Sequence, residues 1–585
     1  MTQQLALSIV GSGGDGAVAA GDILAMACAR DGLHVIKTEA YGPQIRGGES
    51  SCTVRISAKP IFAQADAIDA LIVFNWADFA RFRSEIVLSP TAVIVHEADD
   101  PTPDEIASSP SRRVIPVAFA ALARDAGAPN GKNILALGLL ASIFGLPADA
   151  IRAAIEKRFA KKSAAVLEGN RNAFDRGFAL GEELGLPVAK FLYTATTSKL
   201  LMSGNEASAV GAVDAGCRFF AGYPITPSSE ILHFMAEWLP KLGGSCLQTE
   251  DELAAIGGVV GGSFSGVKSM TSTSGPGLSL MAEMIGLASM AEVPAVIVNV
   301  QRGGPSTGLP TKSEQSDLLH AVFASHGDTP RVVLAPVDVE DSFHITVDAF
   351  NIAEEYQLPV IVLSDQSIAQ RRETVSRESL IHDVVSRRVA SPEALEDFQR
   401  YQLTEDGVSP MSMPGMAGGM FQTNGLEHDE RGRPSSMYIV HERMNEKRYR
   451  KLDAIARHYR LYRRFGAEKP EIGILCWGSS TGPVREAIDV LTAEGLAVAA
   501  FVPRILMPLP AENIQQFVNS CAELLVVELS FSAQFHQLLR TQIDLPRAKT
   551  HVYARSGGKA LGVTEIIDQV RRCTAGTEKA EEVLA

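Results

Sequence analysis

The sequence GYPITPSSE, at residues 222–230, is the strongest motif of the chain. Pro224 and Pro227 restrict the backbone between them, and Ser228 or Ser229 suits the first position of the helix that the following ILHFMAEWL predicts. We therefore expect a rigid turn from a strand into a helix. A hydroxyl held at such a turn is well placed to hydrogen-bond a substrate oxygen, and the alternative is a turn whose hydroxyls only cap the helix.

Helical and strand patterns alternate on both sides of this turn. A helical pattern covers residues 207–215, and apolar strand patterns lie near 246, 268–273, 295–300, 331–334 and 359–364. Such alternation is typical of a parallel sheet covered by helices. The sequence therefore predicts an α/β unit over residues 197–372.

The first 185 residues predict another α/β unit. The strand patterns LALSIV (5–10), ALIVFN (70–75) and AVIVHE (92–97) alternate with helical patterns, the first of them over 17–29. Residues 134–146 are apolar but shorter than the ~20 residues that a membrane span needs, so we expect a core helix there.

A third, smaller α/β unit is predicted over residues 468–575, beginning with the strand EIGILCW. Before it, residues 373–467 read as a linker or excursion, because the pattern weakens and 409–434 are rich in Gly, Pro and Met. The methionines of this segment either seal a ligand or partner face or belong to a flexible linker. They are Met411, Met413, Met416 and Met420.

Acidic residues stand at the start of an apolar, Gly-rich helix in TEDELAAIGGVVGGSFSG, residues 249–266. The acids are Glu250, Asp251 and Glu252. Tight packing of this helix, followed by the Gly-Pro-Gly turn of TSTSGPGLSLM (271–281), favours one carboxylate in a buried site. The alternative is that the acids stay in water and only favour the helix dipole.

Cations and hydroxyls follow the strand AVIVNV, in NVQRGGPSTGLPTKSEQSD at 299–317. Ligands of open α/β sheets gather where parallel strands end. The segment supplies Arg302, Ser306, Thr307, Thr311 and Lys312. These residues suit a small anionic substrate, and the alternative is a solvated loop.

The sequence GSGGDG, residues 11–16, places Gly11, Gly13, Gly14 and Gly16 between a strand and a helix. Such a turn suits a phosphate group. Glu39 lies about where a dinucleotide site needs an acid, but Asp15 would put a negative charge beside the phosphate and disfavours NAD(P). A tight turn without a ligand is the other alternative.

The tripeptide Gly14-Asp15-Gly16 is also typical of a magnesium–thiamine diphosphate motif, which needs an Asn or equivalent oxygen ligand 25 to 30 residues later. Residues 42–46 supply none, so we reject the motif in this chain. The segment YGPQIRGGES (41–50) instead offers Arg46 on a Gly-rich loop. This arginine suits a phosphate or carboxylate, or else a solvated turn with a local salt bridge.

The composition of the chain disfavours several classes of function and of site. The chain has 585 residues, 46% of them apolar, and a net charge of −14 that disfavours nucleic-acid binding. Seven cysteines without a C-x-x-C pair favour reduced thiols in a cytoplasm, with no iron–sulfur or zinc site from this chain alone. The first ten residues lack the basic start of a secretory signal, and no stretch is long enough for a membrane span.

The motifs GNEASAVGAVDAG (204–216), GYPITPSSE, TEDELAAIGG, TSTSGPG and VQRGGPSTGLPTKSEQ together resemble the alpha subunit of 2-oxoacid:ferredoxin oxidoreductases. The resemblance is strongest to the 2-oxoglutarate type, in which a gamma domain is fused in front. It implies an α/β fold of three domains with mostly parallel sheets. These are a gamma-type Rossmann-like domain (1–185), a thiamine diphosphate pyrimidine-binding-type domain (197–372) and a transketolase C-terminal-like domain (468–575).

The resemblance also implies a chemistry. In this family thiamine diphosphate attacks the keto carbon of a 2-oxoacid, CO2 leaves, electrons pass singly through a [4Fe-4S] cluster to ferredoxin, and coenzyme A takes the acyl group. A separate beta subunit is implied to hold Mg2+ with the diphosphate, and the cluster. The implied assembly is a heterotetramer of two alpha–beta pairs, with ferredoxin as electron partner.

Site residues follow from their places in the family motifs. The resemblance implies that Glu252 meets the aminopyrimidine of thiamine diphosphate, with Glu250 as the fallback. Substrate contacts are implied for Tyr223, Pro224, Ile225, Thr226 and Arg302, with Thr307 and Lys312 for a distal carboxylate. Contacts to coenzyme A are implied for Gly11, Gly13, Gly14, Gly16 and Arg46, and no metal ligand is expected in this chain.

The implied reaction is the oxidative decarboxylation of 2-oxoglutarate to succinyl-CoA, or its CO2-fixing reverse as in a reductive TCA cycle. Three alternatives stay open. The substrate is pyruvate, a branched-chain or an aryl 2-oxoacid; or the chain is a non-catalytic nucleotide- or acyl-CoA-binding scaffold; or it is a self-sufficient NAD(P) dehydrogenase.

Overall fold

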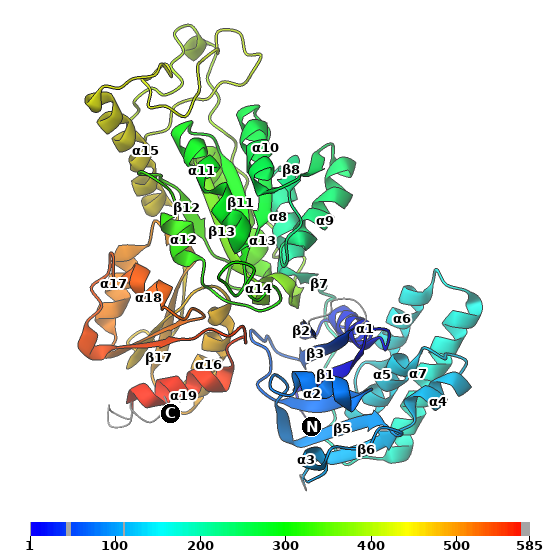
Figure 1. Cartoon of the computed structure of the whole chain (residues 1–585). Helices are drawn as coiled ribbons and strands as arrows, with labels where there is room; N and C mark the ends of the chain where they lie inside the picture. Colours follow the sequence, from blue (N-terminus) through cyan, green and yellow to red (C-terminus); the bar gives the residue numbers. More distant parts are fainter. Residues whose placement is uncertain (1, 43–47, 109–110, 575–585) are drawn as a thin grey trace. The chain divides into compact units, whose positions relative to one another are not determined.

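The computed structural model describes residues 2–42, 48–108 and 111–574, and the chain divides into two compact units (Figure 1). Unit 1 comprises Met1–Met202, Arg371–Ser379 and Gly562–Thr564. Unit 2 comprises Ser203–Gln370, Leu380–Leu561 and Glu565–Ala585. No helix among the described residues is long and apolar enough to cross a membrane.

Unit 1 is built on one mixed sheet with the strand order β6-β5-β4-β1-β3-β2-β14-β7. Its strands are β1 (Gln4–Ser12), β2 (His34–Tyr41), β3 (Glu49–Ser57), β4 (Ile68–Val73), β5 (Leu88–Glu97), β6 (Arg113–Val117), β7 (Leu200–Ser203) and β14 (Arg372–Val375). The predicted strands appear as β1, β4 and β5, which are parallel as expected. On the other side of β1 the sheet changes direction, because β3 runs antiparallel to both β1 and β2. A short connection joins β2 directly to β3, and only antiparallel strands can be joined in this way.

Helices cover this sheet, and two of them pack unusually closely. The helices of unit 1 are α1 (Ala17–Arg30), α2 (Trp76–Phe82), α3 (Asp104–Ala107), α4 (Phe119–Asp125), α5 (Lys132–Phe144), α6 (Ala148–Phe159) and α7 (Ala164–Leu184). Helix α5 is buried from Asn133 to Phe144, which confirms the predicted core helix. A methyl group on Gly138 of α5 would collide with the carbonyl group of Phe174 in α7, so glycine permits the close approach.

The first sheet of unit 2 has the strand order β18-β12-β13-β11-β10-β8-β9 and is parallel except for β18. Its strands are β8 (Phe219–Gly222), β9 (Ser245–Gln248), β10 (Ser269–Thr273), β11 (Ala295–Gln301), β12 (Val332–Leu334), β13 (Pro359–Asp365) and β18 (Ile505–Met507). The helices are α8 (Gly204–Asp214), α9 (Ser229–Trp238), α10 (Glu252–Phe264), α11 (Gly275–Met290), α12 (Leu318–Phe323), α13 (Val339–Tyr356) and α14 (Gln366–Gln370). The predicted strands near 246, 268–273, 295–300, 331–334 and 359–364 are confirmed as β9 to β13.

The second sheet of unit 2 has the strand order β15-β17-β16-β19-β20. Its strands are β15 (Tyr462–Gly466), β16 (Ile472–Leu475), β17 (Val498–Pro503), β19 (Glu523–Glu528) and β20 (Thr550–Ala554), with helices α16 (Thr481–Ala493), α17 (Ala511–Ser520), α18 (Gln534–Leu539) and α19 (Val563–Thr574). The two sheets of unit 2 share one hydrophobic core, in which Ile297 of β11 belongs to the same buried cluster as Leu475 and Phe535. The predicted α/β class with mostly parallel sheets is confirmed.

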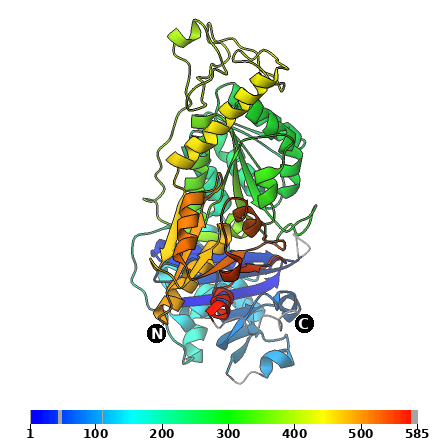
Figure 2. The same ribbon diagram turned by 90° about the vertical axis from the view of Figure 1, so that its left-hand side faces the viewer.

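Residues 376–437 form an excursion with little regular structure, which ends in helix α15 (Tyr438–His458). Figure 2 shows α15 in yellow beside the first sheet of unit 2, with the excursion at the end where α15 begins. The sequence pattern did not predict α15. Of the methionines proposed to seal a face, Met411 is fully buried and Met413 packs against Gly266, whereas Met420 is 91% exposed.

Candidate active site

Four loops that carry the predicted motifs meet at one edge of the first sheet of unit 2. Strands β9, β8, β10 and β11 are neighbours and run parallel, so their carboxyl ends share this edge. The GYPITP turn follows β8, and Glu252 begins the helix after β9. The Gly-Pro-Gly turn follows β10, and Arg302 follows β11. The topology therefore gathers side chains that lie up to 80 positions apart in the sequence.

The GYPITPSSE turn is held by its own backbone and by a neighbouring helix. The amide and hydroxyl of Ser228 both donate to the carbonyl oxygen of Ile225, at 2.9 and 3.1 Å. Ser228 occupies the predicted N-cap position of α9, but its hydroxyl makes no capping bond to the helix because it is engaged inside the turn. Asn205 of α8 donates to the carbonyl oxygen of Pro227 at 2.9 Å, a contact that sequence reasoning missed.

Arg302 joins this turn to the end of β11. Its Nη1 donates to the carbonyl oxygen of Thr226 at 2.5 Å, and the residue is only 7% exposed. Within the described part of the chain its buried Nε has no hydrogen-bond partner. Burial lowers the pKa of Arg302, and the negative charge of Asp317 opposes that effect. The structure thus holds a buried cation with donor capacity to spare at the sheet edge.

Glu252 is the first residue of α10 and is 5% exposed. The side chain of Asp251, which caps the helix, accepts from the amide of Ala254 at 2.8 Å, while Glu250 is exposed. Glu252 itself has no hydrogen-bond or ion-pair partner among the residues that the structure describes. Buried carboxylates are normally satisfied, so an unpartnered one marks a place for a ligand.

The Gly-Pro-Gly turn makes room for this carboxylate. Gly277, in the first turn of α11, is so close to Glu252 that a Cβ atom there would lie 2.5 Å from Glu252 Oε1. Helices α10 and α11 lie side by side in unit 2 (Figure 1). Glu252 is therefore positioned between the starts of two helices, whose N-termini favour negative charge.

The loop after Arg302 folds back on itself. Gly303 donates its amide to the carbonyl oxygen of Lys312 at 3.0 Å and accepts from the amide of Leu309 at 2.7 Å. Lys312 is half-buried beside Gly558, and Thr307 is exposed at the tip. The backbone of Lys312 thus pairs with Gly303, the residue that follows Arg302. Thr307 lies at the tip of the loop and not beside Arg302 in this pairing.

The remaining predicted substrate contacts belong to the turn after β8. Tyr223 and Pro224 are exposed, and Ile225 and Thr226 are half-buried. The backbone of Thr226 contacts Arg302, as described above. The turn therefore contributes an exposed aromatic residue and a backbone acceptor to the edge that carries Arg302.

Polar side chains that the sequence did not single out support this edge. Gln315 donates to the carbonyl oxygen of Trp477 at 2.7 Å and accepts from the amide of Leu529 at 2.9 Å, so the second sheet of unit 2 holds the segment after Lys312. Asn299 of β11 donates to Asp317 Oδ2 at 2.9 Å. The only feature of the sequence that could have pointed to these side chains is the presence of polar residues at the end of an apolar strand.

In unit 1 the glycine motif forms the expected turn between β1 and α1. Gly14 and Gly16 have φ of 106° and 77°, a backbone conformation that glycine adopts without strain. The amide of Gly13 donates to the carbonyl oxygen of Gly48 at 2.7 Å, so this turn lies against the connection after β2. Arg46, the predicted cation of that connection, lies outside the described residues.

Asp15 does not present the free negative charge that the sequence suggested. Its carboxylate accepts from the amide of Ser12 at 2.9 Å and lies 2.7 Å from Lys132 Nζ. The acid needed for a dinucleotide site is also absent from its expected place, because Glu39 is paired with Lys37 and accepts from Tyr41, and β3 separates β2 from β1. These contacts disfavour the NAD(P) alternative.

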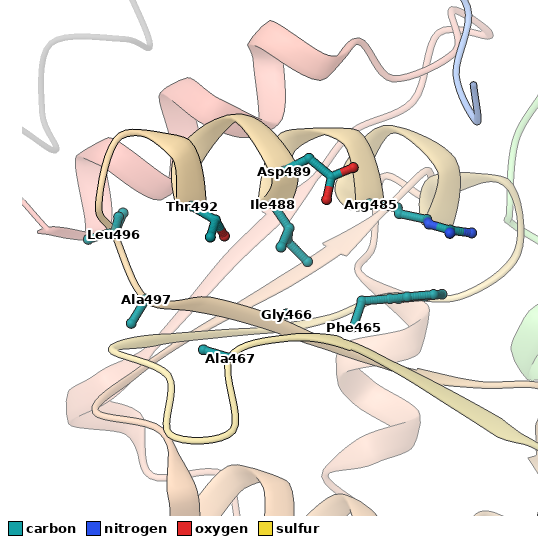
Figure 3. A pocket seen from close by; sticks show the side chains of 9 residues that line it. All are labelled: Phe465, Gly466, Ala467, Arg485, Ile488, Asp489, Thr492, Leu496 and Ala497. Atoms are coloured by element: carbon teal, nitrogen blue, oxygen red, sulfur yellow. The ribbon is translucent and has the colours of Figure 1, made fainter. Parts of the chain in front are cut away.

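A pocket of about 540 Å³ lies between α16 and β15 (Figure 3). Its wall includes Phe465, Arg485, Ile488 and Asp489, and the Arg485 guanidinium lies 5.0 Å from the centre of the Phe465 ring. None of the predicted site residues that the structure describes lines it. The pocket is therefore separate from the edge that carries Glu252 and Arg302.

Three family models match successive parts of the chain. Residues 6–180 match pyruvate ferredoxin/flavodoxin oxidoreductase, and residues 210–447 match the thiamine diphosphate-binding part of pyruvate flavodoxin/ferredoxin oxidoreductase. Residues 470–566 match core domain II of pyruvate:ferredoxin oxidoreductase. Each match contains most of the strands of one of the three sheets.

Individual relatives agree with these matches. The chain is 38% identical over 378 residues to 2-oxoglutarate synthase subunit KorA of Methanothermobacter thermautotrophicus, with 64% of this chain and 98% of that protein covered. It is 30% identical to 2-oxoacid:ferredoxin oxidoreductase 1, subunit alpha, of Aeropyrum pernix, with 92% and 93% covered. Among solved structures, it is 37% identical to 2-oxoglutarate:ferredoxin oxidoreductase from Magnetococcus marinus with 2-oxoglutarate, coenzyme A and succinyl-CoA bound. That match has a TM-score of 0.93 and covers 98% of this chain and 100% of the other.

Proposed function

Because this chain belongs to the 2-oxoacid:ferredoxin oxidoreductase family as an alpha subunit, we propose that it oxidises 2-oxoglutarate with coenzyme A to succinyl-CoA. The family is one of thiamine diphosphate-dependent oxidoreductases that act on an oxo group and pass electrons to an iron–sulfur protein. The observation that carries the proposal is Glu252, a buried carboxylate with no partner in the described part of the chain.

The residues at the sheet edge fit the aminopyrimidine of thiamine diphosphate. Glu252 is buried and unpartnered, and Gly277 leaves space beside it that a larger residue would fill. When bound, thiamine diphosphate supplies the nucleophilic carbon and the electron sink that decarboxylation of a 2-oxoacid needs. Glu252 holds a proton at N1′ of the pyrimidine ring and exchanges it during the reaction, a positioned acid–base role.

Arg302 binds and orients the substrate in this proposal. A guanidinium pairs with a carboxylate through two parallel hydrogen bonds, and Arg302 has an unpartnered Nε for this purpose. Thr226 fixes Arg302 through its carbonyl oxygen and presents its hydroxyl at the same turn. Lys312, anchored beside Arg302, binds the distal carboxylate of a dicarboxylic substrate, with Thr307 nearby on the same loop.

A substrate panel tests the choice of 2-oxoglutarate. The purified complex is assayed with 2-oxoglutarate, pyruvate, a branched-chain and an aryl 2-oxoacid, with coenzyme A and ferredoxin. We expect the highest kcat/KM with 2-oxoglutarate and a selective loss of that preference in Lys312→Ala. Higher kcat/KM for a monocarboxylic substrate would refute the assignment while leaving the reaction class intact.

Replacing Arg302 by alanine should mainly weaken capture of the 2-oxoacid. The loss of a hydrogen bond to a charged group costs about 1.5–3 kcal/mol, so kcat/KM should fall roughly 10- to 100-fold, mostly through KM. Initial rates against 2-oxoacid concentration measure the effect. Arg302→Lys keeps the charge without the paired donors and should lie in between, whereas unchanged KM and kcat/KM in Arg302→Ala would remove this residue from the site.

Unit 1 supplies contacts to coenzyme A in this proposal. The turn of Gly11, Gly13, Gly14 and Gly16 opens α1, and helix N-termini bind phosphate groups. Lys132 pairs with Asp15 and so reduces the repulsion between this acid and a phosphate. The test is to titrate the complex with coenzyme A and to measure amide hydrogen exchange. We expect the amides of residues 11–16 to become protected from exchange. Protection only of other residues would contradict the assignment.

The proposal places the Mg2+-held diphosphate and the [4Fe-4S] cluster in a separate beta subunit. Asp15, the acid of the Gly-Asp-Gly tripeptide, is already bound by Ser12 and Lys132. Apolar residues surround the end of α10 that carries Glu252: Tyr223, Leu247, Leu253 and Leu280 are 40–51% exposed. A nearly uncharged helix such as α10 is usually covered along its length, so we assign the exposed side of α10, together with these residues, to the beta subunit in an alpha–beta pair, two of which form the tetramer.

A bulky charge on the exposed side of α10 should block assembly without unfolding the chain. Gly261 is exposed in α10, and a Cβ atom there would meet nothing within 4 Å, so Gly261→Arg fits the isolated chain. We expect at least a tenfold weaker association with the beta subunit and an unchanged melting temperature. Val166→Arg, at an exposed position of α7, is the matched control. Normal assembly of Gly261→Arg would show that another surface receives the partner.

A further inference from the structure

Asp317 faces Arg302 from the far end of the loop that follows β11. Its charge acts on Arg302, although the two side chains form no direct ion pair among the described contacts. The amide of Asp317 donates to Gln301 Oε1 at 3.1 Å, and its Oδ2 accepts from Asn299 Nδ2 at 2.9 Å. Two side chains of β11 therefore fix this acid immediately beside the residue that precedes Arg302.

The Gly-Pro-Gly turn holds Asp317 as well as Glu252. A Cβ atom on Gly275 would lie 2.9 Å from Asp317 Oδ2, just as one on Gly277 would lie 2.5 Å from Glu252 Oε1. The first turn of α11 thus has a carboxylate against each of its glycines. Its free amides and dipole favour negative charge on both sides, so the acid for the cofactor and the acid facing Arg302 both lie against one helix start.

Arg302 needs such a counter-charge. A buried guanidinium is costly when no negative group compensates it, and the one hydrogen bond that Arg302 makes to the described residues goes to a neutral carbonyl group. The pKa of Asp317 is raised, mainly by burial and in small part by the charge of Glu314. The hydrogen bond from Asn299 and the charges of His320 and Arg302 limit this increase.

We propose that Asp317 is a positioning residue for Arg302, which compensates the buried charge of the guanidinium and keeps it turned toward the substrate carboxylate. The inference rests on the proposed function, because it assumes that Arg302 binds the 2-oxoacid. Asp317 acts through Arg302 and does not itself touch the substrate. Its removal should therefore change substrate capture and leave the later steps nearly intact.

The test is Asp317→Asn in the assembled enzyme, because asparagine preserves the shape and the bond with Asn299 while removing the charge. We expect KM for 2-oxoglutarate to rise roughly tenfold with a change in kcat of less than about threefold, comparable with the loss of one hydrogen bond to a charged group. Asp317→Glu restores the charge and should recover part of the loss. Asp328→Asn, which neutralises an exposed acid, should match the wild type.

A double-mutant cycle separates positioning from a structural role. In the Arg302→Ala background, Asp317→Asn should have no further effect on KM, whereas a purely structural role would add its full effect again. An unchanged or lower KM in Asp317→Asn, with Arg302→Ala still impaired, would overturn this inference and leave the proposed function standing. An unchanged KM in Arg302→Ala itself would instead overturn the role of Arg302 in the proposed function.

Discussion

Replacing Glu252 by alanine in the purified complex is expected to abolish most acyl-CoA formation and leave the chain folded. The side chain is buried at the start of α10, and no partner for it exists among the described residues. If its task is proton exchange with the aminopyrimidine, its loss should cost about 10²- to 10⁴-fold in kcat. Steady-state assay of coenzyme A-dependent ferredoxin reduction measures the effect.

Two variants sharpen this experiment. Glu252→Gln keeps the size of the side chain but cannot exchange the proton, so its activity should be as low as that of Glu252→Ala. Glu250→Ala, two residues earlier at an exposed position, should retain near-normal activity. Substantial turnover by Glu252→Ala, or a loss confined to Glu250→Ala, would contradict the role given to Glu252.

The melting temperature of Glu252→Ala gives an independent measurement. Glu252 is 5% exposed and forms no hydrogen bond or ion pair among the described residues, so removing its carboxylate breaks no stabilising contact of the chain. We therefore expect Glu252→Ala to melt at the same temperature as the wild type or higher in the absence of thiamine diphosphate. Inactivity caused by unfolding would appear as a lower melting temperature.

The parallel strands of unit 2 were predictable because burial on both faces makes such strands continuous apolar runs. Residues 295–300 and 359–364 are runs of this kind and appear as β11 and β13. Strand β3 was not predictable in the same way. Its sequence ESSCTVRIS mixes polar and apolar residues, and its place between β1 and β2 depends on pairing rather than on composition.

Helix α15 escaped prediction for a related physical reason. Its buried face includes Lys447, Arg448 and Lys451, whereas a search for apolar residues at helical spacing assumes that charged residues face water. These lysines are buried because they meet an acid from a distant part of the chain. No local pattern carries that information.

The residues of the candidate site differ in the same way, because some could be predicted from local sequence patterns and others could not. Glu252, Thr226 and Arg302 stood out because they belong to compact motifs at the ends of strands. Asp317 and Asn299 did not, because their importance comes from the three-dimensional approach of β11, the following loop and the first turn of α11. Arg302 contacts Thr226 through a carbonyl group, which no side-chain pattern predicts.

The acid that meets the lysines of α15 is Glu292, two residues after α11 and 1% exposed. Lys447 and Lys451 each place Nζ 2.6 Å from its carboxylate, and Arg400 of the excursion donates to its carbonyl oxygen at 2.6 Å. Although burial acts to raise it, the pKa of Glu292 is held below its ordinary value by Lys447, Lys451 and Arg400. One carboxylate thus compensates three buried cations and ties the excursion and α15 to the end of α11.

Glu292→Gln should therefore loosen this part of unit 2 strongly. Removing one partner of a buried ion pair costs about 3–5 kcal/mol, because the other charges stay buried without compensation. Hydrogen exchange of α15 should accelerate by roughly 10² to 10⁴, and Glu283→Gln, at an exposed position of α11, should leave it unchanged. Normal protection of α15 in Glu292→Gln would show that other contacts hold the excursion in place.

Two lysines share the single carboxylate of Glu292, so the cluster has a surplus cation. This surplus should make the stability of the folded chain depend on pH. Burial lowers the pKa of Lys447 from 10.5 to about 7, so between these values the unfolded chain binds a proton that the folded chain lacks. Stability should then rise as the pH increases from about 7 toward 10, and the full cost should be present below about 7. Lys447→Met removes the titrating amine and should flatten this rise and slow the exchange of α15 at pH 6.5, the opposite of Glu292→Gln. An equally steep rise in Lys447→Met would place its origin in another group.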